Sequence, residues 1–374
     1  MKIVVALDSF KGGLTAAAAC RAVADGLREA DPAADIVLKP MADGGEGTAA
    51  ALLAARPGGV RHSATVSGPL PGRCVDAEYI WFPEGAMAVV EMAVASGLPL
   101  LAEHERNPLL TSTRGTGELI RAAVEQGAQR ILLAIGGSAT VDGGIGAAAA
   151  LGWRFLDDNG RDVPAAGGHL KQIAKIVPPP QRLRTEITVL CDVTNPLCGP
   201  RGAATVFGPQ KGATPEMVGL LEDGLLHLAQ CVRRDLGCDV LNLPGGGAAG
   251  GLGAGAVAFF GAQLAPGIAT IMEACKLDES LRDADWCLTG EGSFDNQSLQ
   301  GKVVSGVAGL AREQGVPVVV LAGRVKADPA EYRAHGIQAA LATHAPDMPM
   351  EQVLLNERAL LRVTAARWRK SLDD

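Results

Sequence analysis

Several patterns that mark common protein classes are missing from this chain. Its eight cysteines form no CxxC pair and no HExxH motif occurs, so neither a zinc site nor a disulfide framework is indicated. We expect reduced thiols, as in a cytosolic enzyme. Lys and Arg form no run longer than two outside the tail at 367–370, and the net charge is −7. No nucleic-acid partner is therefore expected.

Membrane and export signals are also missing. The apolar stretch at 3–7 is too short for a signal peptide and reads as a first strand ending at Asp8. The uncharged segment 240–272 is interrupted by Pro244 and Pro266 and has no flanking aromatic anchors, which disfavours a membrane span. We expect a cytoplasmic protein with no membrane partner.

The standard nucleotide-binding signatures do not occur either. The chain has no GxxxxGK[ST] motif, no H-R-D or D-F-G set and no G-x-S-x-G elbow. A GxGxxA match at 45–50 follows a predicted strand, but the next acidic residue is Asp76, beyond the spacing of a dinucleotide site. The histidines share no metal-ligand spacing. A dinucleotide oxidoreductase is therefore disfavoured.

What the chain does contain is glycine, 48 residues of 374, often beside acidic or hydroxyl residues. Such placement is typical of loops that approach a ligand closely. The composition, 48% hydrophobic and 20% charged, is that of a globular protein. The length exceeds the usual limit of about 250–300 residues for a single core, so two domains are expected.

Strands alternate with helices at both ends of the chain, which predicts an α/β fold with a parallel sheet. The N-terminal part predicts strands at 3–7 and 36–38, with Thr15 as the N-cap of the helix between them. The C-terminal part predicts strands at 286–288, 316–321 and 337–341, a loop at 289–292 and a helix at 303–314. Residues 1–59 plus 284–374 are interpreted as one doubly wound domain, Rossmann-like or flavodoxin-like.

The middle of the chain begins differently. Short strands at 64–67, 77–82 and 87–92 are joined by Gly- and Pro-containing turns, which predicts antiparallel pairing. A helix at 116–126 and strands at 131–135 and 187–190 follow. Residues 60–283 are interpreted as an inserted mixed α/β domain, although residues 116–151 could instead join the parallel sheet.

Ligands of open parallel sheets bind beyond the carboxyl ends of the strands. Five predicted strands end in loops that combine Gly, Ser or Thr with acidic residues: 8–12, 42–48, 136–144, 191–196 and 289–295. Glycine lets backbone N–H groups approach an oxyanion, and carboxylates can hold Mg²⁺. Lys11, Lys211, Lys302 and Arg324 lie at strand ends or beside glycines and are candidate phosphate ligands. The combination predicts a site for phosphoryl transfer.

These loops, taken in order, resemble the type 1 glycerate kinase family. The resemblance rests on the segments 8–12, 42–48, 136–140, 192–197, 207–213, 248–253 and 289–302. Three positions depart from the family pattern: Gly13 stands where Ser is common, Val141 where Asn is usual, and Val304 where Pro is common. The resemblance implies phosphorylation of an organic acid, with the ATP γ-phosphate passing to (R)-glycerate with Mg²⁺ in a cleft between two domains. It also implies 2-phosphoglycerate as the product, although the residues alone do not choose between the two hydroxyls.

We assign hypothetical roles to the residues of these loops. Lys11 and Lys302 would neutralise phosphate charge, Asp192 would act as the base and Asp43 would also act in catalysis. Asp43, Glu46 and Asp295 are the candidate metal ligands. The candidate substrate or nucleotide contacts are Asp8, Ser9, Gly44, Gly45, Glu46, Gly136, Gly137, Ser138, Thr140, Asn195, Lys211, Gly290, Glu291, Asp295 and Gln297.

Two other functions stay open at this point. A Mg²⁺-dependent phosphatase or phosphomutase could use Asp8 as its nucleophile, but Phe10 stands where such enzymes place a second Asp. A non-catalytic binding protein for small acidic metabolites would not need so many carboxylates. A homo-oligomer is compatible with the sequence.

Overall fold

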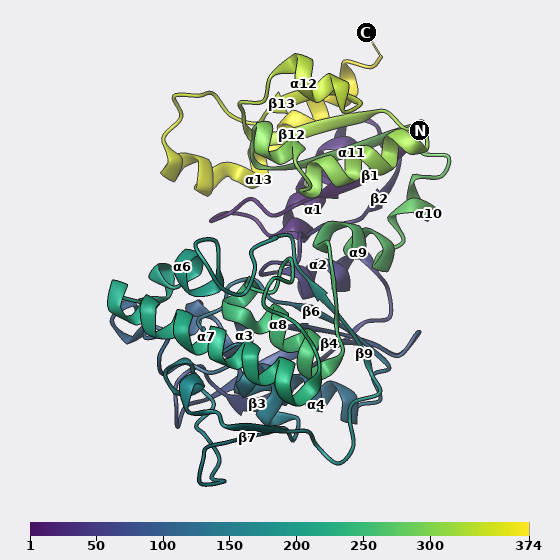
Figure 1. Ribbon diagram of the computed structural model, residues 1–374. Coiled ribbons are helices and arrows are strands. Elements are labelled where there is room, and N and C mark those ends of the chain that lie inside the picture. Colours follow the sequence, from purple (N-terminus) through teal and green to yellow (C-terminus); the bar gives the residue numbers. More distant parts are fainter. Residues whose placement is uncertain (374) are drawn as a thin grey trace. The chain divides into compact units, whose positions relative to one another are not determined.

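The chain forms two compact units in the computed structural model, which describes residues 1–373 (Figure 1). Unit 1 contains residues 1–43, 50–57 and the chain from Ile268 onward. Unit 2 contains residues 44–49 and 58–267. Each unit has its own sheet and its own buried apolar core.

Unit 1 is built on a five-stranded parallel sheet of order β13-β12-β11-β1-β2. Its strands are β1 (Lys2–Leu7), β2 (Asp35–Leu38), β11 (Trp286–Phe294), β12 (Val318–Val325) and β13 (Ile337–Ala342). This is the flavodoxin-like strand order, and it confirms the predicted α/β class with a parallel sheet. The order reverses between β1 and β11, which makes the carboxyl ends of these two strands the expected ligand site of this unit.

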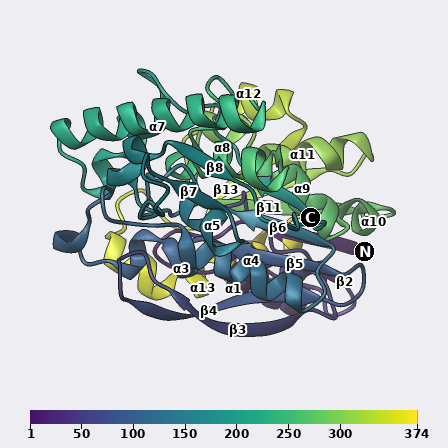
Figure 2. The same cartoon turned by 60° about the horizontal axis from the view of Figure 1, so that its bottom comes forward.

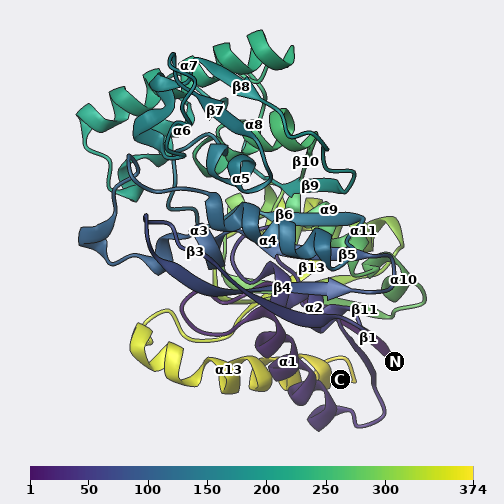
Figure 3. The same cartoon turned by 90° about the horizontal axis from the view of Figure 1, so that it is seen from below.

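The structure confirms the predicted helix after Thr15 and the predicted helix at 303–314 in unit 1. The hydroxyl of Thr15 accepts the N–H of Ala18 at 3.3 Å, which confirms the predicted N-cap. Helices α1 and α13 pack side by side (Figure 3) and bury Leu27, Leu361 and Trp368. The helices are α1 (Ala16–Ala30), α2 (Thr48–Ala55, whose first two residues belong to unit 2), α9 (Gly267–Ala274, which begins in unit 2), α10 (Leu277–Leu281), α11 (Val303–Glu313), α12 (Pro329–Ala334) and α13 (Met350–Lys370).

The predicted loop at 289–292 is wrong, because β11 continues through it to Phe294. Strand β12 runs on to Val325 and supplies the backbone partners, pairing Ser293 with Arg324. The close pairing requires glycine at position 290, where a Cβ would lie 1.8 Å from the carbonyl oxygen of Leu321. The pairing of β11 with β1 stops earlier, at Leu7 and Gly290, so the last part of β11 extends past the end of β1.

Unit 2 contains a mixed six-stranded sheet of order β10-β9-β6-β5-β4-β3. Its strands are β3 (Val60–Ser67), β4 (Cys74–Phe82), β5 (Met87–Glu91), β6 (Arg130–Ala134), β9 (Glu186–Leu190) and β10 (Gln263–Ala265). Strands β3, β4 and β5 pair antiparallel, as predicted, and the other pairs are parallel. Because β6 lies in this sheet, the alternative placement of residues 116–151 in the other sheet is wrong. A small hairpin of β7 (Arg154–Leu156) and β8 (Lys175–Val177) is separate.

The helices of unit 2 surround this sheet, and the long α7 is seen lengthwise in Figure 2. Helix α4 packs on β3, β4 and β5, whereas α8 contacts β9 and β10. In α8 the residues Ala249, Gly250 and Gly251 have positive φ angles, so its first turn is not helical. The helices are α3 (Ala93–Ser96), α4 (Arg114–Glu125), α5 (Ile145–Ala150), α6 (Ala203–Phe207), α7 (Pro215–Leu236) and α8 (Ala248–Phe260).

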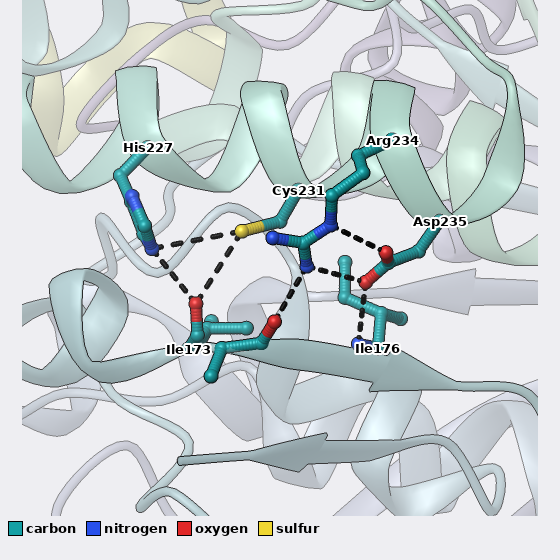
Figure 4. A network of polar contacts seen from close by, with 7 residues as sticks. Ile173, Ile176, His227, Cys231, Arg234 and Asp235 are labelled. Carbon is teal, nitrogen blue, oxygen red and sulfur yellow. Dashed lines mark hydrogen bonds and ion pairs between the residues drawn. The ribbon is translucent and has the colours of Figure 1, made fainter. Parts of the chain in front are cut away.

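A polar network fastens α7 to the segment that leads into β8 (Figure 4). His227 Nε2 lies 2.8 Å and Cys231 Sγ 3.4 Å from the carbonyl oxygen of Ile173, and the carboxylate of Asp235 accepts the N–H of Ile176 at 2.8 Å. Burial raises the pKa of Cys231, which disfavours its thiolate. His227 and Cys231 therefore hold α7 against Ile173, and the Cys231 thiol is not an activated nucleophile.

The uncharged segment 240–272 forms α8 and β10 of unit 2 and, from Ile268, the first part of α9 in unit 1. Across residues 1–373, the structure has no helix with the length and apolar character needed to cross a membrane.

Candidate active site

The first group of candidate residues follows the carboxyl ends of β1 and β11 in unit 1. The N–H of Asp8 donates to the carbonyl oxygen of Gly290 at 2.9 Å, which extends the pairing of the two strands by one residue. The Asp8 carboxylate accepts the N–H of Ser9 at 2.6 Å. Asp8, Ser9 and Gly290 therefore lie at the switch point of the sheet, as the sequence predicts for a ligand-binding edge.

Asp8 lies in a negative environment at this edge. The pKa of Asp8 is raised to about 6, mainly by burial and also by the negative charges of Asp43 and Glu291, against the lowering effect of the hydrogen bond from the Ser9 N–H. The structure thus brings two other predicted carboxylates close enough to Asp8 to repel its charge. Carboxylates that lie this close together are stabilised by a cation or by hydroxyl groups that donate hydrogen bonds. A ligand that carries a metal ion would supply such a cation.

Glu291 extends this acidic group along β11. Burial raises the pKa of Glu291, a hydrogen bond from Ser298 and the charges of Lys302 and Lys11 lower it, and Asp295 raises it. Its Oε1 is buried and has no hydrogen-bond partner within the described residues. A buried carboxylate oxygen without a donor is costly, so this atom is available for a ligand.

Asp295 has a structural contact of its own. Its Oδ1 accepts the N–H groups of Gln297 and Ser298, at 2.9 and 3.3 Å, and so caps the short 3-10 helix Asn296–Leu299. Gln297 is exposed, and Lys302 is the exposed N-cap residue of α11. The charges of Lys302, Lys11 and Asp295 all act on Glu291, so unit 1 gathers these candidates around one carboxylate.

The second group lies at the carboxyl ends of β6 and β9 in unit 2. The loop Gly136–Thr140 follows β6 and is held by the neighbouring backbone, since Leu98 N–H donates to Gly137 O at 2.8 Å and Ala139 N–H to Ser96 O at 2.9 Å. Gly137 has a φ of +73°, a conformation that favours glycine. The backbone of this loop is therefore fixed in place by its neighbours.

Lys211 supports this loop from inside unit 2. The residue is 1% exposed, and its Nζ donates to Ser138 Oγ and to Thr140 O, each at 2.7 Å. Burial lowers the pKa of Lys211 to about 7, and the negative charge of Asp142 counteracts this effect. Asp142 is itself buried and accepts the N–H and the hydroxyl of Thr113. The sequence predicted Lys211 as a phosphate ligand, whereas in the structure its ammonium group donates to Ser138 and Thr140.

Sequence reasoning missed Glu91, which holds the glycine-rich loop 44–47. Glu91 ends β5, is 8% exposed, and its Oε1 accepts the N–H of Ala49 at 2.7 Å. The loop also packs closely, because a Cβ at Gly44 would lie 2.8 Å from that of Leu190. Glu46 is exposed on this loop and faces solvent. An apolar strand that ends in Glu does not indicate where this carboxylate binds. Its contact with Ala49, 42 positions away, was therefore not predictable from the sequence.

Asp192 and Asn195 lie in the loop after β9. The carboxylate Oδ1 of Asp192 accepts the N–H of Gly267 at 2.8 Å, and the residue is exposed. The side-chain amide of Asn195 donates to Arg201 O at 2.8 Å, and the backbone carbonyl of Asn195 accepts the N–H of Gly247. Asn195 therefore shapes the loop, whereas the Gly267 N–H orients the Asp192 carboxylate.

The candidate metal ligands are distributed over both units. Asp43 and Asp295 belong to unit 1, whereas Glu46 belongs to unit 2. Within residues 1–373, no group of three or more His, Cys, Asp or Glu side chains is arranged to hold a metal ion. Protein side chains alone thus form no complete metal cage in the described part of the chain.

Comparison with known proteins identifies the family. Residues 3–372 match the glycerate kinase family. The chain belongs to the glycerate kinase family. A glycerate kinase from Halalkalibacterium halodurans is 44% identical over 99% of both chains. A glycerate 2-kinase from Escherichia coli K12 is 46% identical over 91% of this chain and 89% of its own. The crystal structure of a candidate glycerate kinase 2 from Salmonella typhimurium LT2 superposes with a TM-score of 0.89 at 44% identity, covering 100% of this chain and 98% of that one.

These findings confirm the resemblance and the expectation of a kinase. The structure also places the three departures from the glycerate kinase pattern. Val141 is 0% exposed and lies in the core of unit 2, and Val304 is equally buried in α11. Gly13 lies beside Glu357, where a Cβ would be 1.8 Å from the Glu357 Oε2. None of the three adds or removes a charge at the candidate site.

Proposed function

We propose that this enzyme transfers the γ-phosphate of ATP to glycerate, giving 2-phosphoglycerate from (R)-glycerate with the help of Mg²⁺. The observation that carries the proposal is the group of Asp8, Asp43 and Glu291 at the switch point of a parallel sheet, with the charges of Lys11 and Lys302 acting on it. Phosphoryl transfer requires this mixture of carboxylates and cations. The family match and the name glycerate 2-kinase of one relative support the acceptor and the position.

In unit 1, Lys11 and Lys302 would balance the negative charge of the transferring phosphoryl group. This charge is largest in the transition state, so cations held at the strand ends lower the barrier more than they strengthen ground-state binding. Glu291 would accept a hydrogen bond from a ligand hydroxyl at its unpaired Oε1. Asp8 would do the same beside Ser9.

In unit 2, the backbone of Gly136–Thr140 would cradle an anion, either a phosphate or the glycerate carboxylate. Asp192 would accept the proton of the attacking hydroxyl, because its carboxylate is exposed and oriented by the Gly267 N–H. Gly44 and Gly45, in the loop tied to Glu91, would bring backbone N–H groups to a ligand.

The acidic residues also fit Mg²⁺. Asp43, with Asp295 and Glu46 as further candidates, would hold the ion, which supplies charge neutralisation of the phosphates when bound. Mg²⁺ is commonly bound by one or two carboxylates together with water and substrate phosphates. This agrees with a site that has hard carboxylate oxygens and a repelled Asp8 but no cage of three side chains in residues 1–373.

The proposal is tested by ADP release from Mg²⁺-ATP with D-glycerate, L-glycerate, glycerol, lactate and tartronate. We expect turnover with D-glycerate and little with the others, and phosphorus NMR should place the phosphate on the 2-hydroxyl. Omitting Mg²⁺ should abolish turnover. Phosphate release from phosphoglycerates without any ATP-dependent turnover would instead favour a phosphatase that uses Asp8.

The base assignment predicts a contrast between two carboxylates. Asp192→Asn should lower kcat by about 10²–10⁴-fold, the usual contribution of a general base, with little change in the KM for ATP. Asp43→Asn should instead weaken Mg²⁺ binding, so that a higher Mg²⁺ concentration is needed for the half-maximal rate. Steady-state kinetics with varied Mg²⁺ separates the two. Near wild-type turnover of Asp192→Asn, together with an inactive Asp43→Asn, would show that Asp192 is not the base.

A further inference from the structure

The loop that carries Lys11 is a tight turn fixed by its own backbone. Phe10 N–H donates to Leu14 O, and Gly13 N–H donates to Phe10 O, each at 2.8 Å. Phe10 is 1% exposed and anchors the loop in the core of unit 1, whereas Lys11 is exposed. The position of Lys11 is therefore set by the residues that hold this turn.

One of these residues comes from the far end of the sequence. Glu357 of α13 is 5% exposed, and its Oε2 accepts the N–H of Leu14 at 3.0 Å across a separation of 343 residues. Helix α13 is held firmly, because Leu361 and Trp368 are buried in the core of unit 1. The Glu357 carboxylate thus connects a rigid helix to the loop of Lys11.

The carboxylate has room only because residue 13 is glycine. A Cβ at Gly13 would lie 1.8 Å from Oε2 and 2.8 Å from Cδ of Glu357, well inside van der Waals contact. The φ angle of Gly13 is not in the left-handed region, so alanine suits the backbone there. A side chain at position 13 would consequently expel the Glu357 carboxylate without straining the turn.

We propose that Glu357 is a positioning residue that holds the Lys11 loop for phosphoryl transfer, and that Gly13 leaves the space which this carboxylate occupies in this chain. The inference rests on the role proposed above for Lys11. Small displacements of a group that acts on the transition state lower the rate strongly, so the contact is expected to matter although Glu357 itself touches no substrate.

The test is a double-mutant cycle with kcat/KM for ATP as the readout. Glu357→Ala should lower kcat/KM about tenfold, and Gly13→Ala should lower it equally because it expels the same carboxylate. The double variant should be no worse than either single one. Glu357→Gln should stay within about twofold of wild type, since its amide oxygen still accepts the Leu14 N–H. In a Lys11→Met background, Glu357→Ala should cause no further loss.

Two matched controls accompany the cycle. Glu351→Ala changes an exposed residue of the same helix, and Gly309→Ala adds a Cβ where nothing lies within 4 Å. Both should behave as wild type. Effects of Gly13→Ala and Glu357→Ala that multiply in the double variant would overturn the inference. So would an equal loss from Glu357→Ala with and without Lys11, which indicates a purely structural role. If the wild type itself shows no ATP-dependent turnover, the proposed function fails, and additive shifts of melting temperature in the same cycle would then refute the contact.

Discussion

Replacing Asp8 with asparagine is expected to make the ligand-free protein more stable and less active. Burial and the charges of Asp43 and Glu291 raise the pKa of Asp8 from 3.8 to about 6, so the ionised carboxylate is unfavourable in the folded state. At pH 7.5 the neutral amide should stabilise the fold by about 1–3 kcal/mol, since one pKa unit corresponds to about 1.4 kcal/mol. The kcat/KM should fall about ten- to a hundredfold, the contribution of one charged hydrogen bond of about 1.5–3 kcal/mol.

The pH dependence gives this prediction a definite sign. A carboxyl group whose pKa is raised by folding contributes full stability below about pH 4, and that contribution is lost as the pH rises through about 6. The advantage of Asp8→Asn in melting temperature should therefore be small at pH 4.5 and large at pH 7.5 in Mg²⁺-free buffer. Asp158→Asn, at an exposed position, serves as the control. A less stable Asp8→Asn at pH 7.5 would show that the three carboxylates do not repel one another.

Replacing Lys211 with methionine is expected to disorder the Gly136–Thr140 loop. The variant loses both donors to Ser138 Oγ and Thr140 O, and each buried acceptor left unpaired costs about 1–3 kcal/mol. We expect the KM of one substrate, the one whose anion the loop cradles, to rise more than tenfold (about 1.4 kcal/mol), with a smaller change for the other. Lys175→Met, at an exposed position of the same unit, should leave both KM values unchanged.

The free energy of unfolding should also depend on pH because of the buried ammonium group of Lys211. Because folding lowers the pKa of Lys211 from 10.5 to about 7, the unfolded chain binds more protons between these values, and wild-type stability rises with pH there. Between pH 7 and pH 9 the wild type should gain about 2 kcal/mol relative to Lys211→Met. Denaturant unfolding at both pH values measures this difference. A difference that does not change with pH would mean that Lys211 keeps an ordinary pKa in the fold.

The local features of the fold were predictable from the sequence. Thr15 caps its helix, the apolar runs at 3–7 and 131–135 form strands, and the turn-rich region after residue 60 forms antiparallel strands, because each depends on neighbours within a few residues. The end of β11 was not predictable. Glycine beside Glu291 favours a loop in an isolated segment, and only the paired strand β12 stabilises the extended conformation.

The supporting roles of three residues escaped prediction for a related reason. Glu91, Lys211 and Glu357 all act on loops that lie 42, 71 to 73 and 343 positions away in the sequence. The glycines beside Lys211 predicted a phosphate ligand. Its burial and its contacts with Ser138 and Thr140 depend on distant residues that no local pattern shows. The residues that line the strand ends were visible in the sequence, whereas the residues that hold those loops were not.

The strand order of unit 1 also bears on the path of folding during synthesis. Strand β1 lies between β2 and β11 in its sheet, yet β11 begins at Trp286, and the N–H of Leu14 has its acceptor in Glu357. Strand β1 therefore remains without its partner β11 until the chain beyond Trp286 has been synthesised. Most of unit 2, at 58–267, is complete by then and can fold first. The apolar strand at 3–7 is exposed throughout this interval, which makes unit 1 the late-folding and aggregation-prone part of the nascent chain.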